Sequence, residues 1–343
     1  MADTQLTKKY FASDAEVKWC PGCGDFAIMN AVRSGMVAAG KPRDEVAIVS
    51  GIGCSSRFPY YMETYGFHTI HGRAAAIASG LKVANTDLDV WVISGDGDST
   101  AIGGNHFMHV IRRNVNLNYV LINNKIYGLT KGQYSPTSEM GQVSKTSPYG
   151  VIDYPMAPAK VAISLGGTFV ARGIDRNMKL NEDICVRGAL HKGLSFMEIF
   201  ANCVIYNDGA HNKLTDKEHG ADYNIVLRHG EKMIFGTDKQ LCLVQDGFGI
   251  KAVKVDRVDD ADILIHDEKN QEIASILAGM RPDDGLPLAL GIIYADPRKK
   301  TYDDMVFEQV EAVKAKRGRS MDDIMQSGHT WTVLSFDKLN FMY

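Results

Sequence analysis

Short apolar runs alternate with helical patterns through the first two hundred residues of the chain. The apolar runs that predict buried strands are 46–49, 90–93, 119–122, 168–170 and 195–200. The amphipathic segments that predict helices are 26–39, 74–84, 105–113, 157–165 and 180–191. Strands that alternate with helices are typical of a doubly wound, mostly parallel sheet with helices on both faces. The pattern therefore predicts an α/β fold, with Asp25 as the cap of the first helix.

The pattern changes near residue 205. Residues 207–223 are polar, and residues 245–258 are typical of an extended connecting segment. A helix is expected at 273–280 and a last strand at 288–294. The sequence thus predicts a first domain at 1–204 and a C-terminal extension, or arm, at 205–343.

Composition excludes several classes of protein. The chain of 343 residues is 45% hydrophobic and 23% charged, with 38 basic and 41 acidic residues and a net charge of −3. These values are typical of a soluble globular protein, and the chain lacks the dense basic blocks of nucleic-acid binders. No apolar run approaches the roughly 18 residues of a membrane span, and the N-terminus lacks the features of a signal peptide. We therefore expect a cytoplasmic protein without nucleic-acid or membrane partners, in which disulfides are unfavourable.

Two of the six cysteines form the turn Cys20-Pro-Gly-Cys23. A Cys-x-x-Cys turn suits a structural zinc site, a thioredoxin-like redox pair or an iron–sulfur cluster. A zinc site usually has a second such pair, which the sequence lacks, and a redox pair would follow a buried strand. Residues 16–19 are a poor strand. The spacing alone leaves these three chemistries, and coincidence, open.

Polar and cysteine residues follow the predicted strands at their carboxyl ends. They are Cys54, the segment Gly95-Asp-Gly-Asp98, the pair Asn123-Asn124 and Cys203. Doubly wound sheets bind ligands outside the carboxyl ends of their strands. We therefore expect a functional site at this edge.

The segment Gly95-Asp-Gly-Asp98 and the pair Asn123-Asn124 match the layout of a magnesium–diphosphate site. Asp96 precedes Asn124 by 28 positions, with a helix and a strand between them. A carboxylate and an amide oxygen suit Mg²⁺, and the carbonyl of Ile126 is a candidate third ligand. Gly95 and Gly97 allow a sharp turn beneath the phosphates. A Gly-Asp-Gly turn alone is common, but the whole arrangement is specific and predicts a diphosphate cofactor.

At this point the sequence resembles a known family, the beta subunits of the 2-oxoacid:ferredoxin oxidoreductases, which are thiamine diphosphate and iron–sulfur enzymes. The resemblance covers about residues 10–295 and comprises several motifs in order. They are Trp19-Cys-Pro-Gly-Cys-Gly-Asp25, Gly51-Ile-Gly-Cys-Ser-Ser56, His71-Gly-Arg73, Gly95-Asp-Gly-Asp98, Asn123-Asn124, Tyr127-Gly-Leu-Thr-Lys-Gly-Gln133 and His266-Asp-Glu268.

The resemblance implies roles for individual residues. The residues expected to hold one [4Fe-4S] cluster are Cys20, Cys23, Cys54 and Cys203. Cys185 and Cys242 lie between apolar neighbours and are expected to be buried packing residues. The residues expected to bind Mg²⁺ are Asp96, Asn124 and, through its carbonyl, Ile126. Those expected to line the thiamine diphosphate are Ile52, Gly53, Cys54, Ser55, His71, Gly97, Asp98, Gly128 and Leu129.

A catalytic role is implied for His71, near the diphosphate or the reacting carbon; a hydrogen-bonded spacer is the alternative. Arg57 and Arg73 are expected to neutralise phosphate or a substrate carboxylate, with surface ion pairs as the alternative. Lys125 and Lys131 are further candidates to face a distal carboxylate, and the sequence does not rank them.

The implied reaction is the thiamine diphosphate-dependent, coenzyme A-linked oxidative decarboxylation of 2-oxoglutarate, or the reverse carboxylation of succinyl-CoA. Electrons would pass through the cluster to ferredoxin. The chain has room for only one thiamine-binding domain, so an alpha subunit is expected to supply the pyrimidine-binding domain in an α₂β₂ assembly, and the arm to pack against it. The chain alone is expected to be inactive.

Alternative functions remain at this stage. The nearest are pyruvate or broad 2-oxoacid use within the same family. A thiamine-dependent decarboxylase or synthase without electron transfer, and an electron-transfer subunit that has lost its thiamine site, belong to other classes. The cysteines argue against an enzyme without electron transfer. Asp96 and Asn124 argue against a subunit that has lost its thiamine site.

Overall fold

The computed structural model describes residues 6–317, 320–329 and 331. The chain divides into two compact units, Met1–Asp303 and Asp304–Tyr343. Among the described residues, no helix is long and apolar enough to cross a membrane. The expected boundary at residue 204 stays a prediction, although residues beyond it contribute strands to the first unit.

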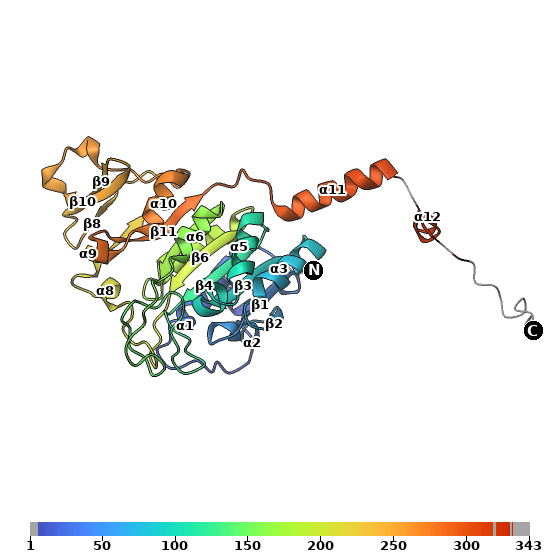
Figure 1. Ribbon diagram of the computed structural model, residues 1–343, viewed down its shortest axis with the longest axis horizontal. Coiled ribbons are helices and arrows are strands. Elements are labelled where there is room, and N and C mark those ends of the chain that lie inside the picture. The colour runs from blue at the N-terminus through green and yellow to red at the C-terminus, as the bar shows by residue number, and fades with distance from the viewer. Residues whose placement is uncertain (1–5, 318–319, 330, 332–343) are drawn as a thin grey trace, which may run out of the picture. The chain divides into compact units, whose positions relative to one another are not determined.

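An eight-stranded sheet forms the centre of the first unit (Figure 1). Its strands in chain order are β1 (Val46–Ser50), β2 (Tyr65–His68), β3 (Asp89–Gly95), β4 (Asn118–Asn123), β5 (Phe169–Ile174), β6 (Ser195–Phe200), β7 (Asn224–Leu227) and β11 (Leu288–Ala295). Their order in the sheet is β2-β1-β3-β4-β6-β5-β11-β7, and the pair of β5 with β11 is the antiparallel one. The predicted doubly wound, mostly parallel sheet is therefore confirmed.

Helices cover both faces of this sheet. The helices of the first unit are α1 (Asp25–Ala39), α2 (Phe58–Tyr61), α3 (Ala74–Ala84), α4 (Asp96–Thr100), α5 (Gly104–Arg113), α6 (Pro158–Ser164), α7 (Met178–Leu190), α8 (Asn212–Thr215), α9 (Gly220–Tyr223) and α10 (Gln271–Gly279). Helices α1 and α7 contribute to one apolar cluster with the sheet. Helices α3, α5, α6 and α10 contribute to the other cluster. The sheet is therefore packed between two apolar clusters, one on each face.

The first helix corrects one expectation. Asp25 is the first residue of α1, while Gly24 is its N-cap and no side chain caps the helix. The Asp25 side chain is instead buried, next to the cysteine turn. At the other end, Gly40 terminates α1 in the left-handed conformation, with φ of +70°.

Three strands lie outside the main sheet, in a small antiparallel sheet of β8 (Ile234–Phe235), β9 (Leu241–Asp246) and β10 (Gly249–Lys254). The segment 245–258, expected to be an extended connection, contains the turn of this β9–β10 hairpin and all of β10. Cys242 on β9 and Cys185 in α7 are both fully buried, as expected of packing residues.

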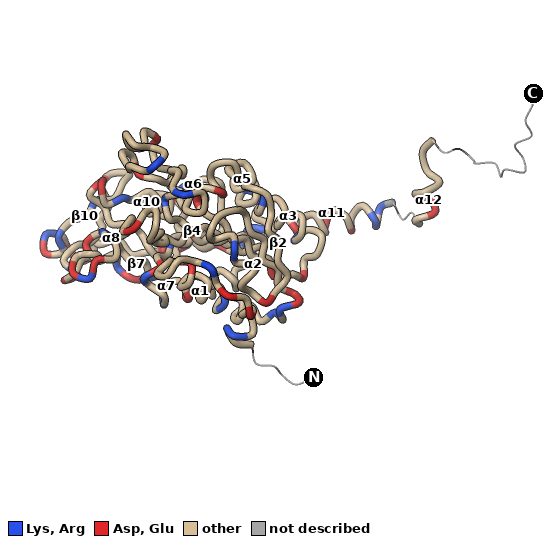
Figure 2. Tube along the Cα trace, turned by 90° about the horizontal axis from the view of Figure 1, so that it is seen from below, with Lys and Arg blue, Asp and Glu red and all other residues tan. Residues whose placement is uncertain are grey.

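The second unit contains most of α11 (Tyr302–Arg317) and α12 (Met321–Met325). Ser320 caps α12, because its hydroxyl accepts the amide of Asp323, whose carboxylate in turn accepts the amide of Ser320. Along the described trace, Lys and Arg are interspersed with Asp and Glu (Figure 2). This mixture agrees with the nearly neutral net charge.

Candidate active site

The four features expected at one edge of the sheet lie on four adjacent strands. The order β1-β3-β4-β6 is uninterrupted in the sheet, and all three pairings are parallel. Cys54 follows β1, Asp96 follows β3, Asn124 follows β4 and Cys203 follows β6. The side chains are thus brought to neighbouring positions by the topology of the sheet.

A cavity of about 60 Å³ lies at the middle of this edge. Its lining residues are Ile52, Gly53, Cys54, Ser55, His71, Gly95, Asp96, Gly97, Asp98, Asn124, Ile126, Tyr127, Gly128, Leu129 and Thr130. All the residues expected to bind thiamine diphosphate or Mg²⁺ are among them. We call it the diphosphate cavity.

Asp96 is buried, and burial raises the pKa of its carboxyl, an effect that hydrogen bonds oppose. The hydroxyls of Ser135 and Thr137 each lie 2.5 Å from Oδ2 of Asp96. The backbone amide of Gly97 also hydrogen-bonds to this carboxyl and lowers its pKa. No sequence motif marks Ser135 and Thr137, because both lie in an irregular loop about forty positions further along the chain.

Asn124 and Ile126 flank a turn of unusual conformation. The amide of Ile126 donates to Oδ1 of Asn124 at 3.1 Å, and Lys125 between them has φ of +55°. A non-glycine residue in this left-handed region is uncommon, and other contacts must hold it there. Asn124 and Ile126 both line the cavity that Asp96 also lines.

Gly97 has space for no side chain. A Cβ at this position would lie 2.3 Å from the ring of Tyr127, whose hydroxyl donates to the carbonyl of Gly97 at 2.8 Å. Tyr127 therefore closes one side of the diphosphate cavity, a role that its place in the Tyr127–Gln133 motif did not reveal.

Asp98 lines the cavity, but its carboxylate is already engaged. Oδ1 accepts the amide of Gly72 at 2.8 Å and Oδ2 accepts the hydroxyl of Ser94 at 2.7 Å. Asp98 thus anchors the turn that carries His71, which is exposed and lines the cavity. Arg73 points elsewhere: its guanidinium lies 3.4 Å from the carbonyls of His71 and Ile102.

A second cavity, of about 230 Å³, contains the four expected cluster ligands. Its lining residues are Lys18, Trp19, Cys20, Cys23, Asp25, Cys54, Arg57, Asn124, Gly128, Leu129, Lys131, Asn202, Cys203, Val204, Ile205 and Tyr206. We call it the cysteine cavity. A side-chain carbon at Gly128 would lie 3.3 Å from Sγ of Cys203 and 3.8 Å from Sγ of Cys54. Within the described part of the chain, no three His, Cys, Asp or Glu side chains are arranged to hold a single metal ion.

The thiols of the cysteine cavity are mutually unfavourable as thiolates. Burial, Asp25 and the neighbouring thiols raise the pKa of Cys23 well above its usual range and that of Cys54 to about 11. Burial also raises the pKa of Asp25 to about 7. A positively charged centre would offset this cost, since thiolates are the form that binds metal. Arg57 and Lys131 lie in the lining of the same cavity.

Lys125, the other lysine proposed to face a carboxylate, lies elsewhere. Its ammonium pairs with Glu139 at 2.5 Å, in a separate cavity of about 270 Å³ that Lys213 and Arg281 also line. The two candidate lysines therefore face different cavities.

The fold and the diphosphate cavity define a thiamine diphosphate-binding domain, and residues 46–199 match the family of the thiamine pyrophosphate enzyme C-terminal TPP binding domain. The chain is 44% identical to 2-oxoglutarate oxidoreductase subunit KorB of Mycobacterium tuberculosis over 95% of this chain and 88% of that protein. It is 45% identical to 2-oxoacid:ferredoxin oxidoreductase subunit beta of Sulfolobus over 55% of this chain and 63% of that one.

The fold matches a solved structure over almost the whole chain. This structure is 2-oxoglutarate:ferredoxin oxidoreductase from Magnetococcus marinus with 2-oxoglutarate, coenzyme A and succinyl-CoA bound. The TM-score is 0.76 at 32% identity, and the match covers 94% of this chain and 96% of that one. The chain belongs to the family of 2-oxoacid:ferredoxin oxidoreductase beta subunits, as the motifs indicated.

Proposed function

We propose that this chain is the beta subunit of a 2-oxoglutarate:ferredoxin oxidoreductase that carries Mg²⁺, thiamine diphosphate and one [4Fe-4S] cluster. The observation that carries the proposal is the contact between the diphosphate and cysteine cavities. Four residues line both of them: Cys54, Asn124, Gly128 and Leu129. A thiamine enzyme without electron transfer has no need for four thiols beside its cofactor.

The residues of the diphosphate cavity fit a bound Mg²⁺–diphosphate. Oδ1 of Asp96, Oδ1 of Asn124 and the carbonyl of Ile126 are hard oxygen ligands, as Mg²⁺ prefers. Two hydroxyls orient the Asp96 carboxylate through Oδ2, and the charge of a cation would favour its ionised form despite burial. Thiamine diphosphate, when bound, supplies a carbanion that adds to the 2-oxoacid. Its ring then accepts the electron pair left by the departing CO₂.

The residues of the cysteine cavity fit a cluster. Cys20 and Cys23 come from one turn, in which the amide of Cys23 donates to the carbonyl of Cys20 at 3.0 Å. The indole of Trp19 donates to the carbonyl of Cys54 at 2.7 Å and holds the second segment. Four cysteines from three segments are the ligand set of a [4Fe-4S] cluster.

A partner subunit follows from the size of the diphosphate cavity. Its volume of about 60 Å³ is far below the ~300–1,000 Å³ of sites that enclose a drug-sized ligand. A small, partly open cavity suits a coenzyme bound between two chains, which supports an alpha subunit with the pyrimidine-binding domain, in an α₂β₂ assembly. Ferredoxin is the proposed electron acceptor and coenzyme A the acyl acceptor.

His71 and Arg57 keep their proposed roles at the site. His71 lines the diphosphate cavity on a turn fixed by Asp98, and Arg57 lines the cysteine cavity beside it. An arginine there is suited to a substrate carboxylate. Arg73, beside the carbonyls of His71 and Ile102, is proposed to support the His71 turn rather than to touch substrate.

Iron analysis tests the cluster. Each cysteine is replaced by Ala in turn in the complex purified without oxygen. We expect Cys20→Ala, Cys23→Ala, Cys54→Ala and Cys203→Ala to lose iron and visible absorbance, and Cys185→Ala to retain both. Full iron in Cys203→Ala, or its loss in Cys242→Ala, would contradict the ligand set.

An anaerobic assay tests the reaction. The complex is given coenzyme A, ferredoxin and either 2-oxoglutarate or pyruvate, and ferredoxin reduction is followed. We expect activity with 2-oxoglutarate, and none from this chain without its partner. Higher turnover with pyruvate would change the proposed substrate and leave the proposed cofactors untouched.

A further inference from the structure

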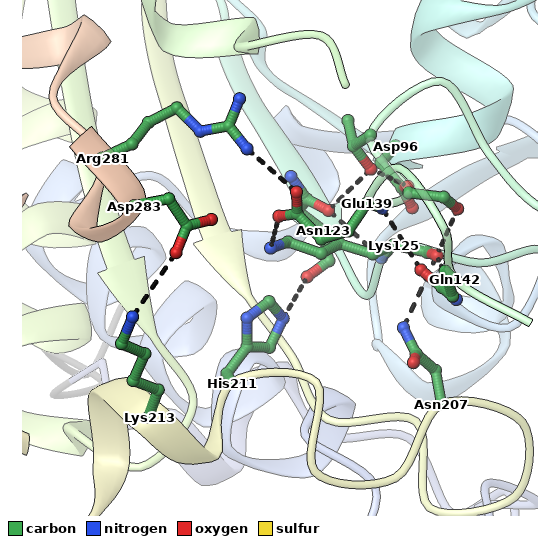
Figure 3. A network of polar contacts seen from close by, with 12 residues as sticks. Asp96, Asn123, Lys125, Glu139, Gln142, Asn207, His211, Lys213, Arg281 and Asp283 are labelled. Carbon is green, nitrogen blue, oxygen red and sulfur yellow. Dashed lines mark hydrogen bonds and ion pairs between the residues drawn. The ribbon is translucent and has the colours of Figure 1, made fainter. Parts of the chain in front are cut away.

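Segment 203–211 lines the cysteine cavity and is hydrogen-bonded to the backbone of residues 123–125. It begins with Cys203, whose thiol lines the cysteine cavity, and it runs beneath the turn that follows β4. The amide of Asn207 donates to the carbonyl of Cys203 at 3.0 Å, which closes a short loop behind the thiol. The side chain of Asn207 leaves this loop in the direction of the cation site (Figure 3).

Asn207 holds the peptide between the two cation ligands of that turn. Its Nδ2 donates to the carbonyl oxygen of Asn124 at 2.9 Å and lies 3.5 Å from that of Lys125. Asn124 and Ile126 stand on either side of Lys125, the residue with φ of +55°. The left-handed torsion therefore lies next to the Asn124 carbonyl that Asn207 holds, while the Lys125 carbonyl also accepts the hydroxyl of Ser138 at 2.6 Å.

His211 gives the same segment a second contact with this backbone. Its ring is 4% exposed, and its Nε2 lies 3.2 Å from the carbonyl oxygen of Asn123. Burial lowers the pKa of His211 to about 3, so the ring is neutral and Nε2 is the donor in this contact. Two successive carbonyls of the Asn123-Asn124 pair are thus held by side chains from one segment.

We propose that Asn207 is a positioning residue for the cation site. By holding the Asn124 carbonyl, Asn207 helps to keep Lys125 in the left-handed conformation. This conformation places the side-chain amide of Asn124 and the carbonyl of Ile126 so that they can bind the same cation as Asp96. Because segment 203–211 also carries Cys203, the geometry of the cation site depends on a segment that lines the cysteine cavity. This inference rests on the proposed function of the diphosphate cavity.

The test measures cofactor affinity in the complex with its partner. Mg²⁺ is titrated at a fixed concentration of thiamine diphosphate and binding is followed by calorimetry, with iron content and unfolding temperature recorded for each variant. We expect Asn207→Ala to weaken Mg²⁺-dependent binding by about 5- to 30-fold, with iron content unchanged. Asn207→Leu, which keeps the volume but not the donor, should weaken it equally, and Asn207→Gln should recover part of the affinity.

Asn224 provides a matched control, because its Nδ2 also donates to two main-chain carbonyls, those of Leu214 and Gly220, away from both cavities. Asn224→Ala should lower the unfolding temperature without changing Mg²⁺ affinity. Wild-type affinity in both Asn207→Ala and Asn207→Leu, or an equal loss in Asn224→Ala, would overturn the proposal. Absence of Mg²⁺-dependent binding in the wild-type complex would instead overturn the proposed function.

Discussion

Arg172 and Glu198 form an ion pair inside the protein, with Nε of Arg172 3.0 Å from Oε2 of Glu198 and side chains only 3% and 1% exposed. Arg172 also donates to the carbonyls of Ala289 and Ala278, at 3.3 and 3.0 Å. Oε1 of Glu198 accepts Nδ2 of Asn123 at 2.8 Å. The pair therefore supports the strand end that carries Asn124.

Replacing Arg172 by Met should destabilise the protein by about 3–5 kcal/mol, because it leaves a buried carboxylate without a partner. Denaturant unfolding measures this loss. The double variant Arg172→Met with Glu198→Gln removes both charges and keeps an acceptor for Asn123, so it should recover part of the stability. A loss below about 1 kcal/mol in the single variant would show that the pair is not needed.

Gly97→Ala should disrupt the diphosphate cavity. The new methyl group would meet the ring of Tyr127 at 2.3 Å, and overpacking of this kind costs about 1–3 kcal/mol. We expect weaker thiamine diphosphate binding, measured by calorimetry. Gly80→Ala in α3 is the control, since a Cβ there meets nothing within 4 Å and Gly80 lines neither the diphosphate nor the cysteine cavity. Equal affinity in the two variants would argue against a role for the Gly97–Tyr127 contact.

Asp98→Ala should loosen the turn that carries His71. It leaves the amide of Gly72 and the hydroxyl of Ser94 without their acceptor, at a cost of about 1–3 kcal/mol. Hydrogen exchange at residues 70–73 should become faster. Asp98→Asn keeps an acceptor for Gly72 and should exchange almost as slowly as the wild type; the same fast exchange in both variants would contradict this account.

Acid should destabilise the protein through His191. Burial lowers the pKa of His191 from 6.5 to about 4, and its Nε2 contacts the hydroxyl of Thr168 at 2.9 Å. Because the folded pKa is the lower one, the unfolded chain takes up the proton first, so this contribution is complete above pH 6.5 and is lost as the pH falls towards 4.

The loss should be on the order of 1 kcal/mol at pH 5. His191→Gln keeps a donor for Thr168 and removes the titration. Unfolding temperatures at pH 7 and pH 5 should therefore differ less in this variant than in the wild type. An identical pH dependence in the two proteins would assign the acid sensitivity to other groups.

The alternation of apolar and polar residues predicted elements that are buried on one or both faces. The bounds of α3 and β6 were predicted to the residue, because a small-residue helix and a continuous apolar run leave little ambiguity. Strand β2 was missed, since all four of its residues are exposed at the edge of the sheet. The hairpin of β9 and β10 was missed because only Ile250 of its second strand is buried, so the strand carries no clear buried pattern.

The residues proposed to bind the cofactor were easier to identify from the sequence than those that support them. Asp96 and Asn124 stand in short motifs directly after strands, which fixes their position. Ser135, Thr137 and Asn207 act from irregular segments, through single hydrogen bonds that leave no periodic pattern. Asp25 was taken for a helix cap because local sequence cannot show that the cysteine turn buries it.

The strand order also determines when, during synthesis, the cysteine cavity can form. Cys20 and Cys203 are separated by 183 positions, and β6, which leads into Cys203, lies between β4 and β5. During synthesis β5 is complete before β6 exists, so β6 must enter between strands that precede it in the chain. The cysteine cavity therefore cannot exist in a nascent chain shorter than about the first two hundred residues. The proposed set of four cluster ligands is therefore brought together only after β6 has entered the sheet.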